Sequence, residues 1–96
     1  MSKVYIVNKS AHDFSDAYNY GEVIFLSDKP MNRFGCNNIH RQFSEKLKDS
    51  SSDDYIVLCS LNSMNAIACA IFAKLHGKLN LLLFKNKKYV ERNLLL

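Results

Sequence analysis

Residues 55–60, YIVLCS, constrain the fold of this chain more than any other stretch. Their apolar side chains follow one another without alternation, which is typical of a central strand covered on both faces. The next stretch predicts a helix that is apolar on one stripe and carries small residues on much of its remaining surface. The stripe consists of Met64, Ile67, Ala68, Ile71 and Leu75. A buried strand that runs into a buried helix is the building unit of a parallel α/β sheet.

The rest of the chain supplies four more strands and one more helix. We expect strands at 3–9, 22–28, 79–84 and 89–96, and an amphipathic helix from about 32 to 48 with Cys36, Ile39, Phe43 and Leu47 on its apolar stripe. Gly77 stands where a left-handed cap would end the second helix, and Asn86 and Lys87 can form the centre of a hairpin turn. The sequence therefore predicts one α/β domain over residues 1–96, with a small mixed sheet whose parallel strands are joined by two helices, and an antiparallel C-terminal hairpin.

Composition narrows the class of protein. At 96 residues and 48% hydrophobic residues, the chain can bury a modest core without disulfides or metals. Its three cysteines are odd in number and lack CxxC spacing, so we expect buried, reduced thiols and a cytoplasmic protein, in the host cell if it is encoded by a phage. Neither a signal peptide nor a membrane span is expected. The net charge of +4 permits a nucleic acid partner without requiring one, because the lysines cluster in solvated turns and surfaces.

Two polar loops meet at the carboxyl edge of the sheet if the first and third strands are parallel neighbours. They follow the first and third strands, and ligands of open α/β sheets bind in the crevice outside those strand ends. The second loop also opens a helix, whose first turn presents unpaired N–H groups to an anion. The candidate ligand-binding residues of the two loops are Asn8, Ser10, His12, Phe14, Ser60, Asn62, Ser63 and Asn65. The alternative for Asn62 or Ser63 is a simple N-cap.

A third polar stretch, 32–41, follows the second strand. It contains arginines that can pair with a phosphate, an aromatic ring that can stack on a base, and amides that can hydrogen-bond to the edge of a base. Its candidate ligand-binding residues are Arg33, Phe34, Asn37 and Arg41. The alternative is that Phe34 packs under the loop, Arg33 is solvated and Asn37 caps the helix.

Catalytic and metal-binding signals are weak. His12 beside Asp13 could act as general acid or base for a phosphodiester, or the pair could be a surface histidine and an Asx turn. No pair of histidines has metal-site spacing, and no dinucleotide, P-loop, serine-hydrolase or zinc-protease motif occurs. We therefore expect no metal and no cofactor.

The overall character of the sequence is clearest in the stretches KVYIVNKSAHDFS, NSMNAIACAIFAKLHGKLNLLLF and YVERN. In this overall character, and over its whole length, the chain resembles small proteins carried by tailed bacteriophages. In size and layout it is also similar to viral proteins that bind or degrade the nucleotide signals of bacterial immunity, including small ring nucleases. No catalytic residue of those enzymes aligns with this chain. This resemblance implies a ligand of the cyclic-nucleotide or ADP-ribose type and an anti-defence role.

Three functional hypotheses follow. The first is non-catalytic binding of a small phosphorylated nucleotide, and the second is a protein-binding inhibitor or interaction module that uses the apolar ending NLLL. The third is a small phosphodiesterase or ring nuclease that uses His12. A homo-oligomer is expected in the first two, because so small a domain makes a shallow cleft that a second chain can close.

Overall fold

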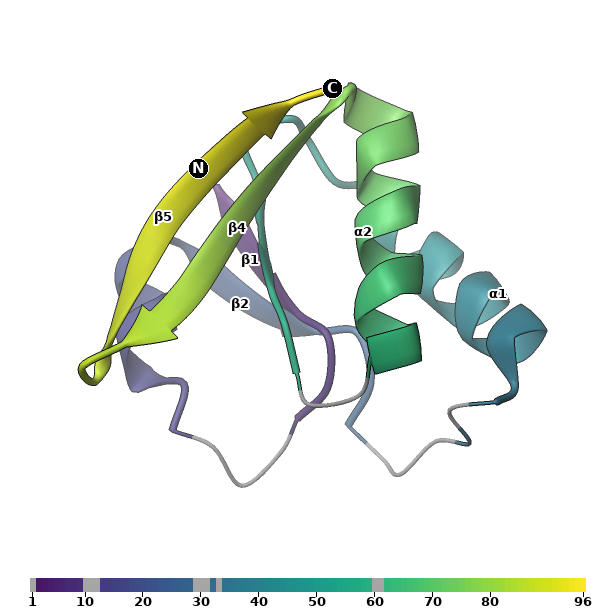
Figure 1. Ribbon diagram of the computed structural model, residues 1–96, viewed down its shortest axis with the longest axis horizontal. Helices are drawn as coiled ribbons and strands as arrows, with labels where there is room; N and C mark the ends of the chain where they lie inside the picture. The colour runs from purple at the N-terminus through teal and green to yellow at the C-terminus, as the bar shows by residue number, and fades with distance from the viewer. Residues whose placement is uncertain (1, 10–12, 29–31, 33, 60–61) are drawn as a thin grey trace.

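The computed structural model describes residues 2–9, 13–28, 32, 34–59 and 62–96. In this part of the chain, five strands form one mixed sheet in the order β2-β1-β3-β4-β5, and two α-helices and a short 3-10 helix pack against it (Figure 1). The elements are β1 (Lys3–Ile6), η1 (Ser15–Asn19), β2 (Glu22–Phe25), α1 (Cys36–Leu47), β3 (Tyr55–Val57), α2 (Asn62–His76), β4 (Lys78–Lys85) and β5 (Lys88–Leu95). Strands β1 to β4 pair in parallel and β5 is antiparallel to β4. The predicted small α/β fold with a terminal hairpin is confirmed.

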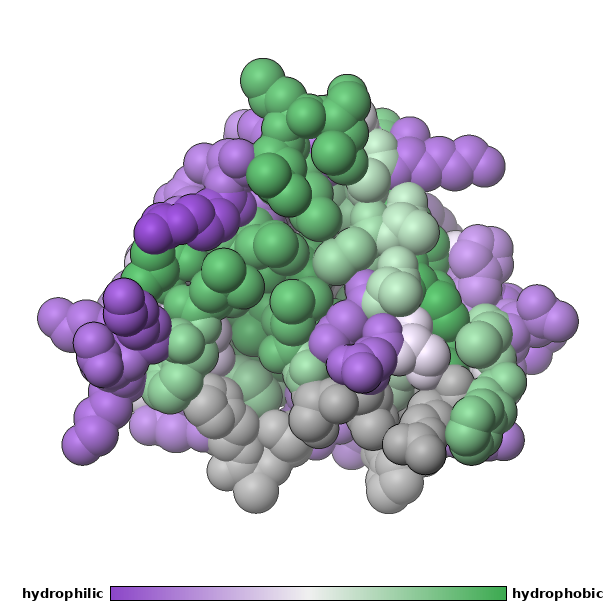
Figure 2. All heavy atoms as spheres, viewed as in Figure 1, coloured by the Kyte–Doolittle hydropathy of each residue, from purple (hydrophilic) through white to green (hydrophobic). Residues whose placement is uncertain are grey.

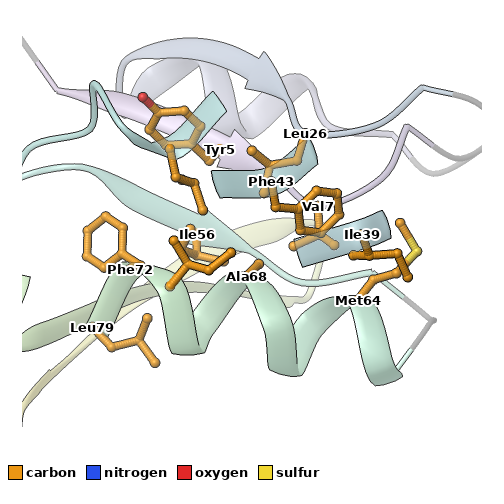
Figure 3. Close-up of a cluster of buried hydrophobic side chains, with 12 residues drawn as sticks. Tyr5, Val7, Leu26, Ile39, Phe43, Ile56, Met64, Ala68, Phe72 and Leu79 are labelled. Atoms are coloured by element: carbon orange, nitrogen blue, oxygen red, sulfur yellow. The ribbon is translucent and has the colours of Figure 1, made fainter. Parts of the chain in front are cut away.

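Two apolar clusters lie on opposite faces of the sheet. The larger one fills the space between the sheet and the two α-helices, where Ile56, Ala68 and Phe72 pack together (Figure 3). The smaller one contains Ala17 of η1 and the strand residues that face it, such as Ile6 and Val57. The sheet is therefore covered on both faces, as the unalternating run 55–60 predicts, although β3 itself is short.

Both predicted chain reversals are confirmed by backbone geometry. Gly77 has φ 68° and its N–H donates to Ala73 O at 2.8 Å, which closes the last turn of α2 with a left-handed residue. Asn86 and Lys87 have φ 53° and 66°, so the β4–β5 turn has two central residues in the left-handed region.

The predicted helix stripes are correct in the middle of each helix and wrong at one end. Ile39, Phe43 and Leu47 are buried, but Cys36, the first residue of α1, is exposed. Leu75 is 51% exposed near the end of α2, while Phe72, which lies off the predicted stripe, is fully buried. The expectation of three buried thiols is thus wrong for Cys36.

The other two cysteines are half-buried. Burial raises the pKa of the Cys69 thiol, which favours the protonated form.

The short helix η1 is held against the hairpin by contacts over a long sequence distance. Asp16 Oδ2 accepts a hydrogen bond from Tyr89 N at 2.7 Å, and the Tyr20 hydroxyl donates to Tyr89 O at 2.8 Å. The side chain of Tyr89 is buried, and this burial, followed by the Asp13 and Asp16 carboxylates, raises the pKa of its hydroxyl. These contacts fix the return path from β1 to β2 over one face of the sheet.

Candidate functional site

Strands β1 and β3 are parallel neighbours, and the chain leaves their carboxyl ends toward opposite faces. After β1 it passes through η1, which packs on the smaller cluster, whereas after β3 it enters α2, which packs on the larger one. Figure 1 shows the ends of β1 and β3 and the first turns of α1 and α2 at the same end of the sheet. This arrangement is the topological switch point at which open α/β sheets bind ligands.

Polar groups tie the ends of β1 and β2 together. Asn8 Nδ2 donates to the Ser27 hydroxyl at 2.7 Å, and that hydroxyl donates to Val7 O at 2.8 Å. The backbone N–H of Lys9 donates to Ser27 O at 2.8 Å. Ser27 is 7% exposed, so these hydrogen bonds are largely shielded from water and hold the ends of β1 and β2 together at this edge. Asn8 is therefore engaged in the fold at the predicted site.

Lys9 and Lys46 both bring an ammonium group to this edge, and Lys46 Nζ donates to Phe25 O at 3.0 Å. Lys9 is exposed, and its Nζ lies 5.5 Å from the centre of the Phe25 ring. The Phe25 ring also meets the ring of Phe14 edge-on, with centroids 5.8 Å apart. Phe14 packs against the smaller cluster through this contact, so the ring predicted to stack on a base also has a structural role.

The polar start of α2 has one clear structural member. Asn65 Oδ1 accepts from Cys59 N and Asn65 Nδ2 donates to Cys59 O, both at 2.8 Å. The side chain of Asn65 thus closes the connection between β3 and α2. Asn62 is the exposed first residue of the helix and Ser63 is half-buried in its first turn. Both lie inside the helix, so the N-cap position precedes them.

The start of α1 is built differently from the predicted alternative. Its N-cap is Gly35 without a capping side chain, and Asn32 Oδ1 accepts from Phe34 N at 2.9 Å. Asn37 is exposed within the helix and does not cap it. Arg41 Nη2 donates to Asn38 Oδ1 at 2.8 Å on the outer surface of α1.

Phe34 does not pack under its loop, because its side chain is 79% exposed. The alternative that Phe34 packs under its loop is therefore wrong, and the exposed ring stays a candidate for stacking on a base.

Four predicted ligand-binding residues, Ser10, His12, Arg33 and Ser60, lie outside the described residues. The Asx-turn alternative at Asp13 is confirmed, since its Oδ1 accepts from Ser15 N at 2.9 Å. In the described part of the chain, no group of three or more His, Cys, Asp or Glu side chains could hold a metal ion. Over the same residues, no helix has the length and hydropathy needed to cross a membrane.

Sequence reasoning did not select Lys9 or Ser27 at this edge. Lys9 lies three residues after the end of β1 and Ser27 two residues after the end of β2, so the rule that selected Asn8 could have selected them. Ser27 was overlooked because the second strand was expected to extend to residue 28, whereas β2 ends at Phe25.

The family of the chain follows from a comparison with protein-family models. The model of the phage Pam3 gp32-like protein family matches residues 2–95. The chain belongs to this family. It is therefore a phage protein, as its resemblance to small phage proteins implied, and the family match spans every strand and helix described above. Searches of the curated proteins and of the solved structures gave no match.

Proposed function

We propose that this family member binds a small phosphorylated nucleotide, of the cyclic-nucleotide or ADP-ribose type, at the carboxyl edge between β1 and β3. The observation that carries the proposal is the switch point itself, where β1 and β3 pair in parallel and their chains diverge to opposite faces. In open α/β sheets, ligands commonly bind at such a switch point.

The chemistry at this edge suits a phosphate. The first turn of α2 brings the positive end of the helix dipole to this edge, where it favours an anion. The exposed ammonium of Lys9 adds a positive charge from the β1 side, and Asn62 adds a polar side chain from α2. The Asn8–Ser27 bridge holds the β1 end in place before a ligand arrives. Pre-formed donors of this kind lower the entropic cost of binding.

We infer binding without cleavage, because the described residues on which this site is built, Asn8, Lys9, Ser27 and Asn62, supply amides, a hydroxyl and an ammonium group and form no acid–base pair. A phage protein of this kind would act as a sponge that removes a nucleotide immune signal from the infected cell. This role extends the resemblance to viral anti-defence proteins.

A matched pair of lysine variants tests the site. Lys9→Gln is expected to weaken binding of the best nucleotide ligand by about tenfold, since it removes a charge-assisted contact worth on the order of 1.4 kcal/mol. Lys74→Gln removes an equal charge from the last turn of α2, at the other end of the same helix, and is expected to leave affinity within about twofold. Isothermal titration calorimetry measures both. Equal losses in the two variants would show that only the net charge matters and would reject the site.

A second candidate function is an interaction module that pairs with a second copy of itself. The observation that favours it is the hairpin face, defined as the side chains of Leu81, Leu83, Val90 and Leu94, which the β4–β5 register places on one side of the sheet. Leu83 and Leu94 are 40% and 49% exposed, and apolar side chains gather over the hairpin beside α2 (Figure 2). Exposed patches of this kind commonly mark protein interfaces.

The self-association hypothesis predicts a concentration-dependent dimer. Light scattering is expected to give twice the 11.0 kDa chain mass at high protein concentration, and Leu94→Lys is expected to return the protein to a monomer, because it buries an unpaired charge in the interface. Tyr18→Lys, which changes a 61% exposed ring on η1, is the control and keeps the dimer. A wild-type protein that stays monomeric at every concentration would reject this hypothesis.

A further inference from the structure

A polar hollow of about 210 Å³ opens at the amino edge of the sheet, away from the carboxyl-edge site. It is formed where the loop before β3 meets the far end of the hairpin. Its lining residues are Ser2, Asp53, Tyr55, Lys78, Asn80, Glu91 and Asn93. The hollow therefore holds two carboxylates and one ammonium group, and its formal charge is negative.

The side chain of Asn80 in this hollow has an acceptor atom that receives no hydrogen bond from the part of the chain that the structure describes. The residue is 3% exposed, and its Nδ2 donates to Ser52 O at 2.8 Å and to Asp54 O at 2.9 Å. Because both neighbours are carbonyl oxygens, the amide nitrogen must face them, and the orientation of the side chain is fixed. Its Oδ1 is then buried with no hydrogen-bond partner among the described residues. Buried acceptors of this kind normally have a partner, so an unpartnered one calls for an explanation.

The Glu91 carboxylate of this hollow is held in place by two donors. The Tyr55 hydroxyl donates to Glu91 Oε1 at 3.3 Å, and Asn93 Nδ2 donates to Glu91 Oε2 at 3.0 Å. Burial, followed by the charge of Glu91 and their hydrogen bond, raises the pKa of Tyr55, so its hydroxyl keeps its proton. Each carboxylate oxygen retains a lone pair for a further donor. Glu91 is thus a pre-oriented acceptor in the same hollow as Asn80 Oδ1.

We propose that this hollow binds a singly charged organic cation that carries N–H donors, a primary ammonium or a guanidinium group. Its N–H groups would satisfy Asn80 Oδ1 and the Glu91 carboxylate together, and Asp53 would add a second negative charge at the rim. Amide and carboxylate oxygens are the usual partners of both groups. The Lys78 ammonium lines the same hollow and repels a divalent metal ion more strongly than a singly charged group, which favours the organic cation.

A titration followed by NMR tests the proposal on the whole chain. Methylammonium or methylguanidinium chloride is expected to give saturable shifts of the side-chain amide signals of Asn80 and Asn93 at constant ionic strength. Tetramethylammonium chloride has the same charge without an N–H group and is expected to give none. Shifts that fail to saturate would mean that no cation binds at Asn80 Oδ1, and equal shifts with tetramethylammonium would mean that charge alone acts there. Either result would overturn the proposal.

A variant pair and a peptide complete the test. Glu91→Gln keeps the shape of the side chain and is expected to weaken binding about tenfold, because it removes the charge from the hydrogen bond. Glu45→Gln, on the exposed surface of α1, is the control and is expected to leave affinity unchanged. Equal affinity of the Glu91 variant and the wild type would contradict the proposal. A capped tripeptide with a central arginine distinguishes the sources, since tighter binding than methylguanidinium indicates a protein side chain and weaker binding indicates a free small cation.

Discussion

Asp54→Ala is expected to lower the free energy of unfolding by about 2 kcal/mol, because it removes a buried carboxylate that accepts two backbone hydrogen bonds and leaves their part-buried N–H donors without this acceptor. Asp54 is 1% exposed, and its two carboxylate oxygens accept from Lys3 N and Ser51 N, each at 2.8 Å. One side chain therefore joins the start of β1 to the turn before β3, two segments that are 51 residues apart at the first contact. Urea unfolding of the variant measures the loss.

The neighbouring residue gives a matched control for this substitution. Asp53 is exposed, and Asp53→Ala is expected to change the free energy of unfolding by no more than about 0.5 kcal/mol. If both variants lose the same stability, the effect comes from net charge and the bridging role of Asp54 is wrong.

The second large effect is a loss of stability at alkaline pH that depends on Tyr5. Burial, followed by the carboxylates of Asp54, Asp49 and Glu22, raises the pKa of Tyr5 to about 12 from the usual 10.0. Because the folded pKa lies above the unfolded one, the contribution of Tyr5 is fully present below pH 10 and is lost as the pH rises toward 12. A difference of two pKa units corresponds to about 1.4 kcal/mol at pH 11 and approaches about 2.7 kcal/mol above pH 12.

Tyr5→Phe isolates this contribution. The difference in unfolding free energy between wild type and variant is expected to be constant up to about pH 9 and to shift in favour of the variant by about 1.4 kcal/mol at pH 11. Tyr18→Phe, at a 61% exposed position, is expected to follow the wild-type curve. The ionisation of other groups cancels in these comparisons. Parallel curves for all three proteins would contradict the assigned role of Tyr5.

The parts of the fold that depend on local sequence could be predicted. The unalternating run at 55–60 identified a covered strand, Gly77 identified a helix end, and Asn86 with Lys87 identified the hairpin turn. Each of these signals arises within a few residues of the feature it predicts, through backbone sterics or side-chain periodicity. The crossover rule predicted parallel strands but left their order in the sheet open, so the pairing of β1 with β3 was a condition of the site hypothesis that the structure meets.

The parts that depend on distant contacts could not be predicted. Helix η1 lies in a stretch whose sequence partly predicted a polar loop. Hydrogen bonds to Tyr89 hold it in position, and Tyr89 is 69 residues from Tyr20 and 73 residues from Asp16. Asn65 was a candidate ligand-binding residue because its sequence position does not reveal that its side-chain amide hydrogen-bonds to the backbone N–H and C=O of Cys59. Exposure of the hairpin leucines depends on the position of β5 at the sheet edge. In each case tertiary geometry decides the role of the side chain.

The central claim is that the carboxyl edge of this sheet binds a phosphorylated nucleotide, and a thermal-shift screen tests it most directly. The panel contains cyclic dinucleotides, ADP-ribose isomers and linear nucleotides, each near 1 mM. A ligand present at 100 times its Kd adds about 2.7 kcal/mol to the native state, which raises the Tm of a domain of this size by about 10 °C. The account predicts such a rise for at least one compound in the wild-type protein and a smaller rise in Lys9→Gln. A melting temperature that none of the compounds shifts would contradict it.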